Sequence, residues 1–186
     1  MQNVKRLKTI MTDIIKIGTH SGKFHCDEVL ACYMLKQLPK YKESPIVRSR
    51  DPAVLDECEI VVDVGAVYDP SRNRFDHHQK TFNETFSSID PTKPWTIKLS
   101  SAGLVYVHFG REVLGAILRK FSDFEEKLVE ILYDKIYENF VREIDAIDNG
   151  IEIAEKKAYD ITTNLSSRVS YFNPDWNQEH LDENVN

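Results

Sequence analysis

Short runs of apolar residues that end at polar residues predict a series of buried strands. Residues 14–19, IIKIGT, are rich in β-branched side chains and reach Gly18, which predicts a strand followed by a turn. A second short strand is predicted at 46–49. A third is predicted at 60–64, where the run IVVDV is apolar on both faces except at Asp63. Such a strand is typical of a parallel sheet covered by helices on both sides.

Segments between these strands carry the signals of helices. Asp27 and Glu28 suit a helix N-terminus, and Pro39 marks the end of the helix that they open. Further helices are predicted over 101–118 and over 123–149, the second of which is closed by Gly150 at its C′ position. In that last helix the apolar residues at three- and four-residue steps are Val129, Leu132, Ile136, Phe140, Ile144 and Ile147. The alternation predicts an α/β fold with a doubly wound, mainly parallel sheet flanked by helices.

Composition narrows the class of protein. The chain has 186 residues, which fits one domain, and 41% of them are hydrophobic, enough for a core. Its uninterrupted apolar runs are far too short to cross a bilayer. Three cysteines without CxxC spacing exclude a disulfide framework and a zinc ribbon, so a reducing compartment is expected. The net charge of −6 means that a polyanionic partner needs local basic groups.

Histidine and aspartate are concentrated in two short segments. Four of the six histidines lie at 19–28, THSGKFHCDE, and at 75–80, FDHHQK, and each segment also holds aspartate. In an open parallel sheet both segments and Asp63 fall at the carboxyl ends of the strands, where ligands bind. Mixed imidazole and carboxylate ligands favour divalent ions such as manganese, zinc, iron or cobalt. A carboxylate in an apolar strand also requires a compensating cation.

Each of these residues also has a purely structural interpretation when taken alone. Asp27 is placed to cap a helix, and His20 or His25 alone is an ordinary loop histidine. Arg50 and Asp51 equally suit a surface turn. His108 lies in an apolar helical stretch and is interpreted as a packing histidine. Only the convergence of the two segments with Asp63 favours a metal site.

Several long motifs carry a family resemblance. They are IGTHSGKFHCDEVLAC, IVRSRDP, IVVDVG, YDPSRNRFDHHQKTF, KLSSAGLVYVHFG, LYDKIYENFVREIDAIDNG and NPDWN. Together they resemble the eukaryotic Myg family, the melanocyte-proliferating-gene exonucleases, over about residues 14–177. The triplet Asp76-His77-His78 is similar to the signature of the Asp-His-His (DHH) phosphoesterases, which include RecJ-type exonucleases and manganese-dependent family II inorganic pyrophosphatases.

The resemblance implies a set of metal ligands. His20 and Asp27 match the first superfamily motif, and His25 stands where that motif has its first aspartate. Asp63 matches the aspartate that is shared by two metal ions, and His77 matches the histidine ligand of the third motif. The implied cofactor is a pair of divalent ions, with manganese as the expected metal. Its six expected ligands are His20, His25, Asp27, Asp63, His77 and Asp148, with Asp145 as the alternative to Asp148.

The same resemblance implies catalytic and substrate-binding residues. His78 is expected to face the substrate phosphate and Asp76 to orient the histidine pair. Separately from the resemblance, the position of Arg48 and Arg50 near a predicted strand end, in the segment RSRDP, suggests a phosphate clamp. Two metals that share Asp63 are expected to activate a water for attack on phosphorus.

The expected function is a metal-dependent phosphodiester hydrolase, a 3′→5′ exonuclease acting on RNA. The alternatives are a small-molecule phosphatase or pyrophosphatase, and a metal-binding domain without turnover. The expected partner is RNA, with no membrane, and the oligomeric state stays open. Family resemblance implies an intracellular protein of the mitochondrion and nucleus, with the cytoplasm as an alternative. Expected segments are a disordered or targeting N-terminus at 1–13, a catalytic domain at 14–159, and at 160–186 a tail or the start of an absent substrate domain.

Overall fold

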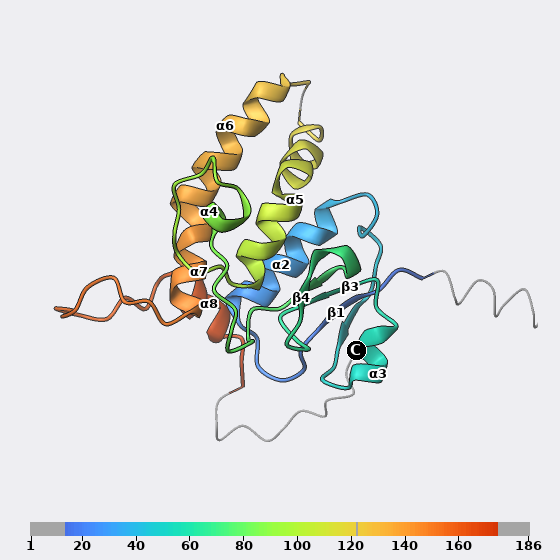
Figure 1. Ribbon diagram of the computed structural model, residues 1–186, viewed down its shortest axis with the longest axis horizontal. Coiled ribbons are helices and arrows are strands. Elements are labelled where there is room, and N and C mark those ends of the chain that lie inside the picture. Colours follow the sequence, from blue (N-terminus) through green and yellow to red (C-terminus); the bar gives the residue numbers. More distant parts are fainter. Residues whose placement is uncertain (1–13, 122, 175–186) are drawn as a thin grey trace, which may run out of the picture.

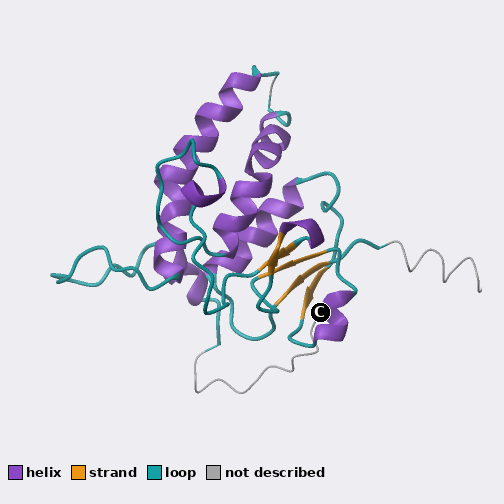
Figure 2. Ribbon diagram, viewed as in Figure 1, coloured by secondary structure: helices purple, strands orange, loops and turns teal. Residues whose placement is uncertain are grey.

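The computed structural model describes residues 14–121 and 123–174, and its strands form one mixed, mostly parallel sheet (Figure 2). The order across the sheet is β2-β1-β3-β5-β4, and only β4 runs antiparallel to its neighbour. The strands are β1 (Ile17–Thr19), β2 (Ile46–Arg48), β3 (Ile60–Val62), β4 (Tyr68–Asp69) and β5 (Arg74–Phe75). The predicted α/β class is confirmed. The predictions for residues 1–13 and 175–186 lie outside the described residues.

The helices cover both faces of this sheet. They are α2 (Cys26–Gln37), α3 (Pro52–Asp56), the 3₁₀ turn η1 (Pro70–Arg72), α4 (Phe86–Ile89), α5 (Ser101–Leu118), α6 (Glu126–Ile136), the π-helical turn η2 (Tyr137–Val141), α7 (Arg142–Asp148) and α8 (Leu165–Ser170). In Figure 1, α2 and α5 lie on one side of the strands and α3 on the other. None of the helices in the described part of the chain combines the length and apolar character of a membrane span.

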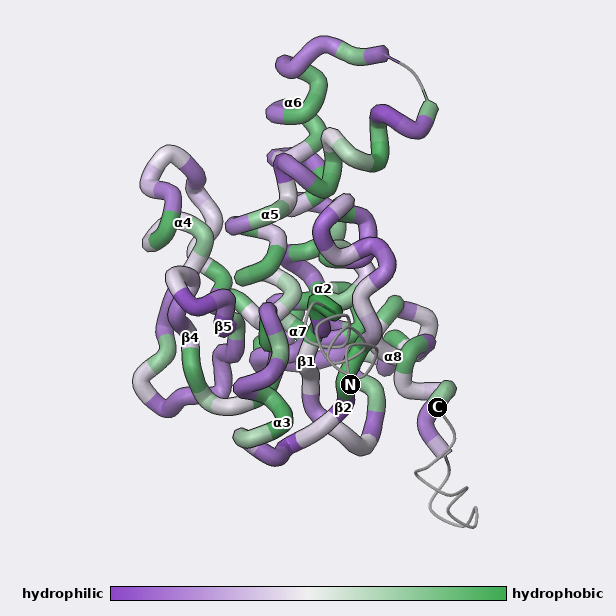
Figure 3. The backbone as a smooth tube through the Cα atoms, turned by 90° about the vertical axis from the view of Figure 1, so that its right-hand side faces the viewer, coloured by the Kyte–Doolittle hydropathy of each residue, from purple (hydrophilic) through white to green (hydrophobic). Residues whose placement is uncertain are grey.

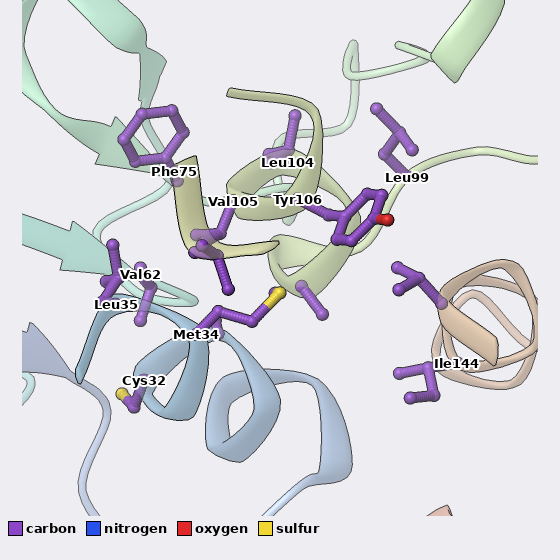
Figure 4. Packing of buried hydrophobic residues seen from close by; sticks show 14 of the residues in the cluster. Cys32, Met34, Leu35, Val62, Phe75, Leu99, Leu104, Val105, Tyr106 and Ile144 are labelled. Atoms are coloured by element: carbon purple, nitrogen blue, oxygen red, sulfur yellow. The ribbon is translucent and has the colours of Figure 1, made fainter. Parts of the chain in front are cut away.

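Two clusters of buried side chains hold the layers together. The larger cluster lies between the sheet and the pair α2 and α5, where Met34 and Leu35 meet Leu104, Val105 and strand residues such as Phe75 (Figure 4). The smaller cluster, on the opposite face under α3, consists of Leu55, Cys58, Val61 and Val64. Because successive residues of β3 point to opposite faces, this strand contributes to both clusters, as its uniformly apolar sequence predicts.

The helix predicted over 123–149 is divided, and its predicted apolar face is wrong in the middle. The described residues form α6, the π turn η2 and α7, and Phe140 is 39% exposed. The buried positions are Val129, Tyr133, Tyr137, Val141 and Ile144. Tyrosine is tolerated at two positions of this buried face because each hydroxyl has a hydrogen-bond acceptor within the fold. Tyr133 donates to Val107 O, and Tyr137 donates to Asp145. Figure 3 shows α5 and α6 extending together beyond the sheet.

A buried carboxylate ties α7 to the start of α5. Asp145 Oδ1 accepts hydrogen bonds from the backbone N–H of Ser100 at 2.9 Å and from its hydroxyl at 2.8 Å. Ser100 is the N-cap residue of α5, so Asp145 satisfies donors that the helix leaves free. The carboxylate lies so close to α5 that a β-carbon at Gly103 would be 2.7 Å from Asp145 Cγ. Position 103 therefore requires glycine because of this close approach.

The first prediction tests this close packing. Gly103→Ala should lower the free energy of unfolding by at least about 1–3 kcal/mol, since the new methyl group must displace a buried, hydrogen-bonded carboxylate. Gly115→Ala in the same helix is the matched control, because its nearest neighbour would be a flexible Arg119 nitrogen at 3.5 Å. That variant should be neutral or stabilising, as alanine favours helices. Urea unfolding of both variants measures the difference, and equal stability of the two would contradict the packing.

Candidate metal centre

Side chains from several elements converge at the carboxyl ends of the strands. His20 follows β1, Asp63 follows β3, and Asp76 and His77 follow β5. The first turn of α2 adds Asp27, and the last turn of α7 adds Asp148. The direction in which the chain progresses across the sheet reverses between β1 and β3. One crossover leads from β1 to β2 on one side, and the next leads from β2 back past β1 to β3. A crevice at such a switch point is where open α/β sheets bind ligands.

Asp63 lies at the centre of this cluster, and each of its carboxylate oxygens faces a different histidine. Oδ2 is 3.3 Å from His20 Nε2, and Oδ1 is 3.6 Å from His77 Nε2. The residue sits one position beyond β3 rather than inside a strand as predicted, and its φ of 58° places it in the left-handed region. Burial alone would raise the pKa of Asp63, but the nearby imidazoles of His20 and His77 outweigh burial and lower it.

His20 is held by a hydrogen bond to the backbone and faces two carboxylates, those of Asp63 and Glu28. Its Nδ1 lies 3.1 Å from Ser21 O, to which it donates, so Nε2 is directed at Asp63 and, 3.8 Å away, at Glu28 Oε2. The carboxylate of Asp63, and then that of Glu28, raises the pKa of His20 to about 10. Glu28 is 1% exposed and also accepts from the His25 backbone N–H at 2.7 Å. Sequence reasoning gave Glu28 only a helix-terminus role.

A second set of possible ligands is formed by Asp27, His77 and Asp148. His77 Nε2 is 3.0 Å from Asp148 Oδ2 and 3.9 Å from Asp27 Oδ2. Burial on its own would lower the pKa of His77, yet Asp148 and Asp63 raise it to about 10. Burial, followed by the charges of Asp63 and Asp148, raises the pKa of Asp27 well above its usual range. Neighbouring carboxylates therefore crowd a site that water scarcely reaches.

The structure separates the two candidates at the end of α7. Asp148 faces His77, whereas Asp145 points to the start of α5 and to the Tyr137 hydroxyl, which donates to it at 3.0 Å. Burial raises the pKa of Asp145 to about 7. The two residues are three positions apart, but they serve different parts of the fold. Asp148, the first choice from the sequence, is the one that joins the ligand groups, and Asp145 does not.

Asp76 and His78 form a pair at the edge of the cluster. Asp76 Oδ1 is 2.6 Å from His78 Nδ1, and Asp76 Oδ2 accepts from the backbone N–H of Ala66 at 2.6 Å. The bond to Asp76 raises the pKa of His78, whose side chain is 57% exposed. His78 lines a cavity of about 410 Å³ together with Arg50, Asp63 and residues around them. Asp76 therefore contacts His78 directly, and its orienting role stays a prediction.

The two predicted phosphate-binding arginines have different surroundings. Arg50 lines the cavity beside His78. Arg48 instead donates to Glu28 Oε1 at 3.4 Å and to Gly22 O at 3.2 Å, and its guanidinium lies 4.2 Å from the centre of the Phe24 ring. Arg48 thus contacts a carboxylate of the cluster, which partly neutralises its charge.

The loop that carries His25 is attached to the C-terminal part of the described chain. The Asn173 side chain accepts from the Phe24 backbone N–H at 2.6 Å and donates to Phe24 O at 2.9 Å. A cavity of about 270 Å³ separates this loop from α7 and α8 and is lined by His25, Asp27 and Asp148. Sequence reasoning missed Asn173, Glu28 and Ser101, whose hydroxyl donates to Asp63 Oδ1 at 3.1 Å. The sequence signal that could have identified Glu28 as part of the site was its position directly after Asp27.

Buried atoms without hydrogen-bond partners indicate that this cluster suits a cation. Among the described residues, these atoms include both carboxylate oxygens of Asp27 and the Nε2 atoms of His20 and His77. Three groups of side chains have ligand atoms close enough to hold an ion: His20, His25, Glu28 and Asp63; Asp63, His77 and His78; and Asp27, His77 and Asp148. Asp63 and His77 link these groups. Burial raises the pKa of Cys26 to about 11 and that of Cys32 to about 12, and neither thiol belongs to the three groups.

Comparison with known proteins identifies relatives over almost the whole chain. The family model MYG1_exonuc, described as "Uncharacterised protein family (UPF0160)", matches residues 16–186. The protein named MYG1 exonuclease of Bos taurus is 56% identical over 169 residues, which are 90% of this chain and 44% of that protein. The Homo sapiens MYG1 exonuclease is 53% identical over 180 residues, covering 96% of this chain and 47% of that protein.

The similarity extends to distant eukaryotes. The MYG1 protein of Dictyostelium discoideum is 45% identical over 179 residues, which are 95% of this chain and 51% of that protein. The chain thus spans about half the length of the curated relatives that it matches. No solved structure is significantly similar to it.

The second prediction concerns the pH dependence of the metal-free protein. His20 and His77 have a pKa of about 10 in the fold and roughly 6.5 when unfolded, so their imidazolium forms stabilise the fold fully below the unfolded value. This contribution is lost as the pH rises toward 10. With chelator present, the melting temperature should therefore fall between pH 7 and pH 10. Saturating Mn²⁺ should restore more stability at the higher pH, because ligand protons no longer compete with the metal. A melting temperature that, in the presence of chelator, stays constant or rises between pH 7 and pH 10 would contradict the raised pKa values of His20 and His77.

Proposed function

This chain belongs to the MYG1 family, and from that membership we propose that it hydrolyses phosphodiesters with the help of divalent metal ions. The proposed substrate is RNA, degraded from the 3′ end, as the resemblance to the Myg exonucleases implies. The observation that carries the proposal is the linkage of three ligand groups through Asp63 and His77, with the buried Asp27 carboxylate lacking hydrogen-bond partners within residues 14–121 and 123–174. Such a cluster is costly to bury unless a cation occupies it.

Two ions are proposed, with Asp63 as the shared ligand. His20, His25 and Asp63 would hold one ion, and Asp27, Asp63, His77 and Asp148 would hold the other. Glu28 stands within reach of the first group and supplies a carboxylate close to the position where His25 replaces the aspartate of the superfamily motif. Imidazole and carboxylate oxygen ligands suit manganese, which is the proposed metal. When bound, such ions lower the pKa of a water and neutralise the charge of a transferring phosphoryl group.

The chain's own residues then bind and orient the substrate. Asp76 accepts the Nδ1–H of His78 and raises its pKa, which favours the protonated imidazole of a side chain that lines the cavity. A protonated imidazole at this place can donate a hydrogen bond to a non-bridging phosphate oxygen, where negative charge develops. Arg50, on the wall of the same cavity, adds a second cationic donor. His78 and Asp76 are therefore the proposed catalytic pair.

The third prediction separates metal binding from fold maintenance at the end of α7. Asp148→Asn should lower the rate of cleavage of a short labelled oligoribonucleotide in Mn²⁺ by at least about 10–100-fold, since a ligand is lost. Asp145→Asn is the matched control. Its amide can still accept from Ser100 and donate to the Tyr137 oxygen, so its rate should stay within about threefold of the parent.

The assay has two further arms. Excess chelator should abolish cleavage by the parent chain, and inorganic pyrophosphate should be hydrolysed more slowly than the oligoribonucleotide. Faster hydrolysis of pyrophosphate would favour the alternative small-molecule phosphatase. Equal losses of cleavage rate in Asp148→Asn and Asp145→Asn would contradict the assignment of Asp148 as a ligand. Absence of manganese-dependent cleavage by the parent would favour the other alternative, a metal-binding domain without turnover.

A further inference from the structure

We propose that a second cleft beside the metal cluster binds a nucleotide that neighbours the scissile phosphodiester. This arginine cleft has a volume of about 240 Å³. Its lining includes Arg50, Arg72, Arg74, Leu55, Val61 and Val64. In this proposal the backbone phosphate of the nucleotide meets the arginines, and its base lies against the apolar residues. The inference rests on the proposed function, because it names the substrate class that the same site would take.

The cleft adjoins the cavity of the metal cluster. Both are lined by Arg50, Val64 and Gly65. The cluster cavity also reaches Asp63 and His78, so a chain that places one phosphate beside His78 can place the adjacent nucleotide in the arginine cleft. A substrate of a single phosphate or pyrophosphate would leave this second space unused.

The apolar wall of the cleft comes from the smaller hydrophobic cluster. α3 has only five residues; Val64 belongs to the buried cluster under it, and Val67 adds an exposed apolar side chain to the cleft wall. Val67 is 39% exposed. A flat base can gain apolar contact here without any sequence preference.

The charge of the cleft is complementary to a phosphate backbone. Three arginines and one aspartate, Asp56, line it, which leaves a formal charge of 3 − 1 = +2 in a chain whose net charge is −6. Among the ion pairs of the described residues, none includes Arg50, Arg72 or Arg74, whereas Arg48 and Arg111 each face carboxylates.

Arg74 is held in place without losing its charge. Its guanidinium donates to three backbone carbonyls, those of Arg72, Asn73 and Cys58, and none of these neutralises it. The side chain therefore connects the β4–β5 turn to the end of α3 while its positive charge stays available for an anion. Surface arginines alone would bind any anion, but their combination with an adjoining apolar wall suits a nucleotide.

The test measures binding without cleavage. Fluorescence anisotropy of a 5′-labelled hexaribonucleotide, with chelator present, compares the parent chain with Arg72→Gln and with Arg119→Gln. Arg119, at the far end of α5, is the matched control. Arg72→Gln should weaken binding roughly fivefold at 0.1 M salt and reduce the slope of log K against log salt by about 0.7, because one phosphate contact to a single strand is lost. Arg119→Gln should change neither value.

A second ligand tests the role of the base. An abasic hexamer, which keeps the sugar-phosphate backbone, should bind the parent chain several-fold more weakly than the hexaribonucleotide. Equal affinities of the two ligands would overturn the base-binding part of the proposal and leave a phosphate site. No measurable binding by the parent, or unchanged affinity in Arg72→Gln while its unfolding curve matches that of the parent, would overturn the cleft.

Failure of the cleft is distinguishable from failure of the proposed function. If Arg72→Gln binds more weakly but the manganese-loaded parent cleaves nothing, the cleft stands and the hydrolase assignment fails. If the parent cleaves the oligonucleotide and Arg72→Gln binds it as well as the parent does, the cleft fails and the hydrolase assignment stands.

Discussion

At the carboxyl ends of β1, β3 and β5 several carboxylates are buried with too few positive partners. The rest of the structure is arranged around this buried negative charge. Asp27 and Asp63 are almost fully buried, and Glu28 and Asp76 lie beside them. Their cationic neighbours are imidazoles and one arginine, Arg48. Taking several charges out of water costs several kcal/mol per ion unless each finds a partner. A divalent cation supplies that partner, so the fold is best understood as built around positive charge at this point.

The surrounding elements are arranged to support this cluster. The N-termini of α2 and α5 both open onto it, so their helix dipoles favour the carboxylates of Asp27 and Asp63. Asp145 fixes the start of α5 through Ser100, and the neighbouring Ser101 then reaches Asp63. The π turn η2 precedes α7, which carries Asp148 to the opposite side of the site. Asp145, which is not one of the ligand groups, thereby helps to position Asp63, which is.

The sequence predicted much of this arrangement because local patterns encode strands, helix ends and the residues that follow them. Asp63 was recognised because a carboxylate is conspicuous in an apolar run, and the segment 101–118 was predicted with its observed bounds. The π turn was not predictable from apolar spacing, since the buried face there is built from tyrosines whose hydroxyls find partners only in the folded chain. Glu28 and Asn173 were missed because their partners, Arg48 and Phe24, are distant in sequence.

The central claim, that unpaired buried carboxylate charge reserves this site for a cation, is tested most directly at Asp27, whose two oxygens have no hydrogen-bond partner among the described residues. The measurement is the melting temperature of the parent chain and of Asp27→Asn at pH 8, each with chelator and with saturating Mn²⁺. We expect Asp27→Asn to melt at a higher temperature than the parent in chelator, because a buried charge is removed, and to gain less stability from Mn²⁺. The claim would be contradicted if, in chelator, Asp27→Asn had a lower melting temperature than the parent. It would also be contradicted if Mn²⁺ raised the melting temperature of the variant as much as that of the parent.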